Sequence, residues 1–292
     1  MIRQLAGAED TGDLLFRLGE QKERELPPSH NGKALGEGLK KLLLSQIRTV
    51  WPVYWETLSL PGNREANEDS IRIVESGAVK CFIVADGLGG HGKGDVASRI
   101  AADAFAETFQ NSEKALPELM SDAFDAAQTR ILEEQRKQGC PLQMKTTVCA
   151  LAVKGDQIQW GHIGDSRLYA FCRGKVKVRT LDHSVPQMLV LAKEIKEKEI
   201  RNHPDRNKLL RVLGISDDSP RYELSQVQSL GDFQAFLLCS DGFWELILEK
   251  EMGALLKKSR SPGEWLEKMK EIVDQRGRNV NMDNYSAIAI MV

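Results

Sequence analysis

Acidic side chains stand at the borders of apolar runs at several separate places in this chain. One apolar run ends at Asp86, a second ends at Asp241, and the last strand-like segment opens at Asp283. Glu68 and Asp69 form a further acidic pair. A glycine follows both Asp86 and Asp241, and because glycine carries no Cβ it lets a carbonyl and a bound ion approach closely. Since hard divalent cations prefer oxygen ligands, the pattern predicts an all-oxygen metal site.

The elements that must position these residues alternate between strand-like and helix-like patterns. Helical patterns cover residues 95–110 and 261–275, and a third, over 111–138, is expected to be interrupted near Pro117. Apolar runs typical of strands cover residues 53–60, 70–74, 80–85, 146–153, 157–163, 166–172, 175–180, 233–239 and 286–292. Hairpin-like turns together with paired helices indicate antiparallel sheets covered by helices, not a parallel sheet.

Composition excludes several classes of partner. With 41% hydrophobic and 28% charged residues the chain is typical of soluble globular proteins. The net charge of −2 gives no reason to expect nucleic acid or an anionic membrane as partner. The chain has no apolar run near the roughly 18 residues of a membrane span, and Glu9 and Asp10 interrupt the N-terminus where a secretion signal needs an apolar core. Five scattered cysteines without a C-x-x-C pair favour a reducing, cytoplasmic location.

Eight short motifs follow one another along the chain, among them Asn-Glu-Asp-Ser, Gly-Asp-Ser-Arg, Leu-Asp-His-Ser and Cys-Ser-Asp-Gly. They occupy residues 62–64, 67–70, 84–87, 145–147, 161–167, 181–184, 238–242 and 283–286. In this order they resemble the metal-dependent protein phosphatases of type 2C (PPM), and the Asp-Gly-Leu-Gly-Gly-His form resembles the bacterial branch. The resemblance implies an α+β fold, a four-layer α-β-β-α sandwich of two antiparallel sheets flanked by helix pairs. It assigns residues 51–292 to the catalytic domain and residues 1–50 to an N-terminal extension.

The resemblance also implies a site for two Mg²⁺ or Mn²⁺ ions. Asp86 matches the carboxylate that bridges both ions. The carbonyl of Gly87 and the side chain of Glu68 would help to hold one ion, and Asp241 and Asp283 would hold the other. Both metals take the same oxygen ligands, so the residues do not distinguish magnesium from manganese.

Three further residues complete the implied site. Asp165, in Gly-Asp-Ser-Arg, matches the ligand of a weaker third ion, although it could instead brace the turn that contains it. Asp69 would act in catalysis mainly through metal-bound water. Arg64 matches the phosphate-binding arginine, because a guanidinium can contact two phosphoryl oxygens at once. The alternative for Arg64 is a surface salt bridge to Glu65 or Glu68.

The implied reaction is hydrolysis of phosphoserine and phosphothreonine in one step, by attack of a metal-activated water. Two divalent ions about 3.5–4 Å apart can lower the pKa of a bridging water and hold the phosphate. The motifs do not identify the group that donates a proton to the leaving group. The animal branch of the family has a histidine directly after Asp-Gly, where this chain has Leu88. His91 and metal-bound water are the alternatives.

Two segments outside the motifs could affect substrate access. Residues 185–211 match the flap beside the active site, and loops on a rigid scaffold commonly determine specificity. Residues 35–47, within the N-terminal extension, have an apolar helical pattern. That segment could pack on the catalytic domain, contact a partner or shield the site.

Two functions other than that of an active protein phosphatase are compatible with the same motifs. A pseudophosphatase would be a binding module without turnover, but a decayed site should have lost some of its carboxylates. A metal-dependent hydrolase of a small phosphorylated metabolite would use the same chemistry on a different substrate. For the phosphatase, the expected partners are phosphorylated proteins, with an opposing serine/threonine kinase and its targets among them.

Overall fold

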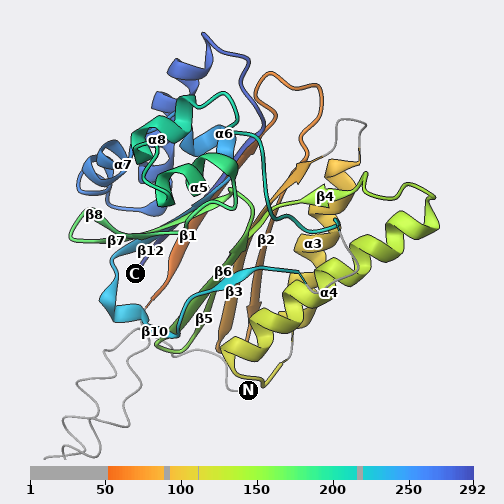
Figure 1. Ribbon diagram of the computed structural model, residues 1–292. Helices are drawn as coiled ribbons and strands as arrows, with labels where there is room; N and C mark the ends of the chain where they lie inside the picture. Colours follow the sequence, from red (N-terminus) through yellow and green to blue (C-terminus); the bar gives the residue numbers. More distant parts are fainter. Residues whose placement is uncertain (1–51, 89–92, 111, 216–219) are drawn as a thin grey trace, which may run out of the picture. The chain divides into compact units, whose positions relative to one another are not determined.

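The computed structural model describes residues 52–88, 93–110, 112–215 and 220–292 (Figure 1). The predicted N-terminal extension, with the helical pattern at 35–47, lies outside the described residues, as does His91. The boundary at residue 51 therefore stays a prediction.

Two antiparallel sheets form the centre of the described part. The first has five strands in the order β1 (Tyr54–Leu60), β12 (Tyr285–Met291), β11 (Ala235–Cys239), β7 (Arg167–Cys172) and β8 (Lys175–Arg179). The second runs β10 (Gln228–Ser229), β6 (Gln157–Ile163), β5 (Val148–Lys154), β3 (Val79–Leu88) and β2 (Asp69–Ser76), with β4 (Lys145–Thr146) on β3 and β9 (Glu223–Leu224) on β6.

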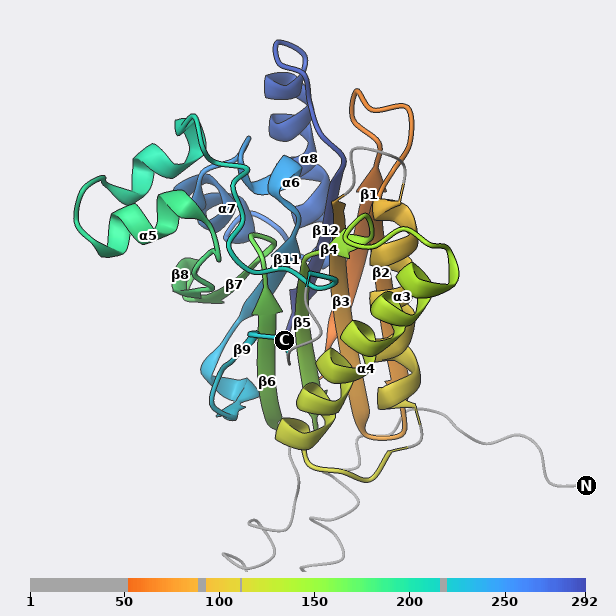
Figure 2. The ribbon, with the colours of Figure 1, turned by 45° about the vertical axis from the view of Figure 1, so that its right-hand side comes forward.

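Helices cover the outer faces of both sheets (Figures 1 and 2). The second sheet packs against α3 (Gly94–Phe109) and α4 (Leu116–Lys137), and the first packs against α7 (Glu249–Leu256) and α8 (Pro262–Gly277). The short helix α6 (Asp241–Trp244) directly follows β11. Of the described helices, none is long and apolar enough to cross a membrane.

Three apolar layers separate these four layers of structure. On β3, Cys81 and Ile83 pack toward α3 and α4, whereas Phe82 and Val84 pack toward the other sheet. Successive side chains of a strand point to opposite faces, so a strand covered on both sides must be apolar at nearly every position. This explains the unbroken apolar run that precedes Asp86.

The structure departs from the sequence predictions in a few elements. The expected break near Pro117 is wrong, because this proline lies in the first turn of α4, where a missing N–H costs no hydrogen bond. Helix α7 and the short strands β9 and β10 were not predicted. The flap contains α5 (Val185–Leu191) and a 3₁₀ helix, η1 (Glu197–Asn202), between β8 and β9.

Candidate metal centre

A cavity of about 420 Å³ lies between the C-terminal end of β3 and the first residue of α6. Seven of the eight predicted site residues line it, and Asp69 is the one that does not. The complete lining is Arg64, Ala66, Glu68, Asp86, Gly87, Leu88, Asp165, Asn207, Leu209, Asp241, Asp283 and Asn284. Residues as far apart in the sequence as 64 and 283 therefore share one cavity.

Strand ends from both sheets bring the carboxylates together. In the second sheet Asp69 pairs with Asp86 across β2 and β3. In the first sheet Asp241 opens α6 just after β11, and Asp283 stands just before the neighbouring strand β12. Asp165 lies in the turn between β6 and β7, which is where the chain passes from one sheet to the other. The site thus forms at one end of the sandwich.

Two glycines allow Glu68 to approach the backbone of β3 and α3. A Cβ on Gly87 would lie 2.6 Å from the carbonyl oxygen of Glu68, and one on Gly94 would lie 2.6 Å from its carboxylate Oε2. No side chain fits at such distances. The N–H of Gly87 also donates to the Glu68 carbonyl at 3.2 Å. Gly87 therefore has a packing role, whatever its own carbonyl binds.

The positive charges near the clustered carboxylates do not offset the effects of burial and mutual repulsion on Asp86, Asp165 and Asp241. Burial raises the pKa of Asp86 and of Asp165 well above its usual range, and the nearby Asp241 raises both further. Burial and the neighbouring Asp283 raise the pKa of Asp241 to about 6. Burial likewise raises the pKa of Asp69 to about 7. Bringing these groups together costs free energy that a cation bound among them would offset.

Asp69 lies behind the cavity and contacts it indirectly. Its Oδ2 accepts a hydrogen bond from the Ser240 hydroxyl at 2.8 Å, on the residue before Asp241. Its Oδ1 is buried and has no hydrogen-bond partner within the described residues. Buried polar atoms are rarely left unpaired, so this oxygen has the capacity to accept a further hydrogen bond.

Arg64 pairs with a residue that the sequence analysis did not consider. Its guanidinium lies 2.8 Å from Oδ2 of Asp283, and not against Glu65 or Glu68. Both side chains are partly exposed, at 48% and 40%. An exposed pair of this kind contributes little free energy, so the arginine can leave it at small cost.

Sequence comparison identifies the family. The sequence model of the family Protein phosphatase 2C matches residues 62–284. The chain belongs to the protein phosphatase 2C family. The serine/threonine phosphatase Stp of Listeria welshimeri is 32% identical over 209 residues, which make up 69% of this chain and 81% of that protein. The resemblance inferred from the eight motifs is therefore confirmed.

Solved structures share the fold of this protein phosphatase 2C chain. A serine/threonine phosphatase of S. agalactiae has a TM-score of 0.73 at 25% identity, over 82% of this chain and 100% of that one. The PstP catalytic domain in complex with two manganese ions has a TM-score of 0.68 at 24% identity, over 82% of this chain and 97% of that one. The predicted fold class is confirmed.

The structure adds residues to the site that sequence reasoning had not assigned. The Asn284 side chain accepts from the N–H of Glu68 at 2.8 Å and donates to the carbonyls of Pro61 and Ala66. It thereby fixes the loop that carries Arg64 and Glu68, through a contact between residues 216 positions apart in the sequence. The flap contributes Asn207 and Leu209 to the cavity. Their polar context in the sequence gave no signal for this.

Leu88 lines the cavity at the position where the animal branch of the family has a histidine. The histidines among the described residues lie outside the lining of this cavity. His162 and His183 are buried, with His183 accepting a hydrogen bond from the N–H of Gly164, and His203 is in the flap. None of these three lines the cavity.

Proposed function

We propose that this chain is a metal-dependent serine/threonine protein phosphatase that acts on phosphorylated proteins in the cytoplasm. The observation that carries the proposal is the cavity itself. It gathers five carboxylates and an arginine in a protein phosphatase 2C fold. The carboxylates suit cations and the arginine suits phosphate.

The donor set fits magnesium or manganese. Asp86, Asp241, Asp283 and Glu68, with the carbonyl of Gly87, offer oxygen atoms alone. Among the residues that the structure describes, no histidine or cysteine lines this cavity. The pKa values of Asp86 and Asp241 are raised, and Oδ1 of Asp69 has no hydrogen-bond partner among the described residues. Both features fit a site that binds cations. When bound, two such ions supply an activated water and neutralise phosphoryl oxygens. The PstP domain with this fold was solved with two manganese ions, which agrees with the proposal.

Arg64 binds the phosphate in this proposal. Its guanidinium leaves the exposed pair with Asp283 and turns to two phosphoryl oxygens. Arg64 contacts Oδ2 of Asp283, so Oδ1 can act as a metal ligand before the phosphate arrives. The same arginine thus holds a carboxylate in place before substrate arrives and holds the phosphoryl group afterwards.

Asp69 orients water in this proposal, and Asp165 binds a third, weaker ion. A water molecule gives up one proton to the solvent and attacks phosphorus while the bond from phosphorus to the serine or threonine oxygen breaks. The departing oxygen keeps the electron pair of that bond and takes up a proton. Leu88 cannot donate this proton, and we propose water as its source.

Phosphorylated proteins, including an opposing serine/threonine kinase and its targets, are the substrates we propose. The cavity is bordered by the flap residues Asn207 and Leu209, and its neighbour, of about 380 Å³, is lined by the flap residues Arg201 and Arg206. A peptide chain on either side of the phosphorylated residue could contact this flap. A small metabolite could reach the carboxylates without using it.

An assay of the purified protein tests the proposal. Manganese-dependent hydrolysis of p-nitrophenyl phosphate, abolished by EDTA and restored by manganese, is the expected result. An inactive protein that still binds phosphopeptides would be a pseudophosphatase. A parallel panel of phosphopeptides and phosphorylated metabolites decides the substrate class. Higher kcat/KM for metabolites than for any phosphopeptide would refute the protein-phosphatase assignment.

A further inference from the structure

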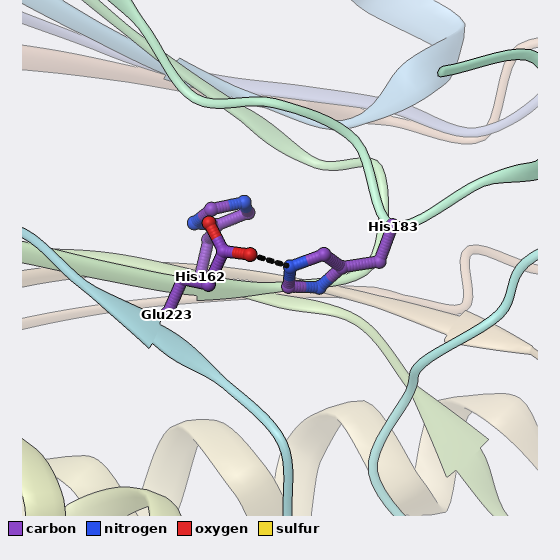
Figure 3. Close-up of side chains that lie close together, drawn as sticks. All are labelled: His162, His183 and Glu223. Atoms are coloured by element: carbon purple, nitrogen blue, oxygen red, sulfur yellow. Dashed lines mark ion pairs between the residues drawn. The ribbon is translucent and has the colours of Figure 1, made fainter. Parts of the chain in front are cut away.

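Two histidines and a glutamate meet outside the cavity described above (Figure 3). His162 is on β6, Glu223 is directly opposite it on β9, and His183 precedes α5. Each offers a ligating nitrogen or oxygen atom, and these atoms all lie within 4.8 Å of one another. In Figure 3 a dashed line joins the Glu223 carboxylate to the ring of His183. The proposed phosphatase reaction uses none of the three.

His162 has the hydrogen bond that is typical of a metal-binding imidazole. Its Nε2 lies 2.7 Å from the carbonyl oxygen of Leu181. A carbonyl can only accept, so Nε2 carries the ring proton and Nδ1 keeps its lone pair. Metal-bound histidines commonly donate their other ring N–H to a carbonyl in this way.

The buried Nε2 of His183 faces the Glu223 carboxylate. The His183 side chain is 6% exposed, and its Nε2 has no hydrogen bond within the described residues, although Glu223 Oε1 is 3.2 Å away. Burial lowers the pKa of His162, and it lowers that of His183 to about 4. Both rings are therefore neutral near pH 7, so the contact with Glu223 is no ordinary ion pair.

We propose that His162, His183 and Glu223 bind a Zn²⁺ ion or a similar transition-metal ion. Two imidazoles and one carboxylate suit zinc, whereas magnesium and manganese prefer the all-oxygen cavity. Three protein ligands leave a fourth position for water. The Glu223 side chain is 54% exposed, and its Oε1 also lies 3.4 Å from Nη1 of Arg211, an exposed ion pair that a bound cation would displace at small cost.

Binding rearranges the cluster. The rings are stacked, with centroids 4.7 Å apart and planes 15° apart, so the side chains must rotate to direct their lone pairs at one ion. The N–H of Gly164 donates to Nδ1 of His183 at 3.2 Å. A neutral imidazole has one unprotonated nitrogen, so binding through Nε2 moves the proton to Nδ1 and breaks this hydrogen bond. We therefore expect an exchangeable ion.

Cobalt titration of the full chain tests the proposal. Excess magnesium is added to fill the all-oxygen cavity. Under these conditions Co²⁺ should give the intense visible absorption of a four-coordinate site with nitrogen ligands. Six-coordinate cobalt among carboxylates absorbs only weakly. His183→Gln and Glu223→Gln should each abolish this band and weaken Zn²⁺ binding, measured by calorimetry, by at least about tenfold. His203→Gln is the matched control and should leave both unchanged.

The outcomes separate cleanly. Loss of the band in both cluster variants but not in His203→Gln supports the site, provided that the variants keep the circular dichroism spectrum of the parent. Glu223 is largely exposed, so Glu223→Gln remains informative if His183→Gln fails to fold. Absence of the band in the parent protein, or an equal band in Glu223→Gln, overturns the proposal. The readout is metal binding, so the result does not depend on phosphatase activity.

Discussion

The indole N–H of Trp244 donates to the backbone carbonyl of Asp165 at 3.0 Å. Arg167 lies over the same indole, 3.3 Å from the ring centroid, and binds both carboxylate oxygens of Asp182 at 2.6 and 2.7 Å. Arg167 and Asp182 are almost completely buried. The Trp244 indole, held beneath the Arg167 guanidinium, therefore fixes the backbone of Asp165 through its carbonyl and leaves the Asp165 carboxylate free.

Trp244→Phe should reduce turnover and stability together. The variant keeps an aromatic ring below Arg167 but leaves the Asp165 carbonyl unpaired, which should cost about 1–3 kcal/mol of unfolding free energy. Trp265→Phe is the matched control, because its N–H donates to the Met252 carbonyl at the same distance, 3.0 Å, far from the cavity. Urea unfolding should show similar losses for both variants. Equal kcat values for the two would contradict the positioning of Asp165 by Trp244.

Asp86→Asn should abolish metal-dependent turnover and yet stabilise the protein in EDTA. The substitution removes one charge from a buried group of carboxylates that raise one another's pKa. In manganese the order should reverse, since only the parent protein gains stability from bound ions. Thermal melts with EDTA and with manganese measure both effects. A variant that manganese stabilises as much as it does the parent would show that Asp86 is not a ligand.

The Asp69 carboxyl should make the stability of the EDTA-treated protein depend on pH. Its folded pKa of about 7 lies above the usual value, so the folded state binds the proton more tightly than the unfolded state. Ionised Asp69 therefore destabilises the fold above pH 7, and this cost diminishes as the pH falls toward 4. The stability advantage of Asp69→Asn over the parent should shrink between pH 8 and 6, by at most about 1.4 kcal/mol per pH unit. Urea titrations at several pH values measure it, and a constant difference would refute the shifted pKa.

Arg64→Ala should raise KM for a phosphopeptide more than it lowers kcat. The guanidinium contacts phosphate both before and during the reaction, so it contributes mainly uniform binding. A charged hydrogen bond of about 1.5–3 kcal/mol corresponds to roughly 10–150-fold in kcat/KM. Arg72→Ala is the control, since Arg72 has a similar exposed ion pair, to Asp103 at 2.8 Å, outside the cavity. If both variants kept the parent's kcat/KM, Arg64 would have no phosphate-binding role.

Asp165→Ala separates an ion ligand from a turn brace. As the ligand of a weak third ion, Asp165 should matter for kcat but little for the tight binding of two ions. As a brace, it should matter for stability by about 0.5–3 kcal/mol and leave chemistry unchanged. Calorimetric manganese titration, thermal melts and rate assays on the same variant decide between them. Normal turnover with a lower melting temperature would exclude the third-ion role.

Local signals in the sequence were sufficient for most of the fold. The run at 157–163 matches β6, because alternating strand patterns and hairpin glycines are local features. The site residues were found for the same reason, since each carboxylate stands at the border of its own apolar run. Pro117 misled the prediction because a proline within a helix and one in its first turn look alike in sequence.

Contacts between distant segments could not be predicted in this way. The ion pair between Arg64 and Asp283 joins residues 219 positions apart. Two glutamates that are closer to Arg64 in the sequence are not its partners. The Trp244 hydrogen bond to Asp165 and the cluster of His162, His183 and Glu223 likewise depend on tertiary packing. Periodicity and motif spacing contain no information about such pairs.

The position of β12 has a consequence for the order of events during synthesis. This strand lies between β1 and β11 and immediately follows Asp283. The first sheet can therefore close only after residues 285–291 have left the ribosome, by which time every other segment of the cavity has already emerged. Domains generally fold as units, so the carboxylates assemble late and together. We therefore expect a nascent chain to be inactive until β12 has taken its place between β1 and β11.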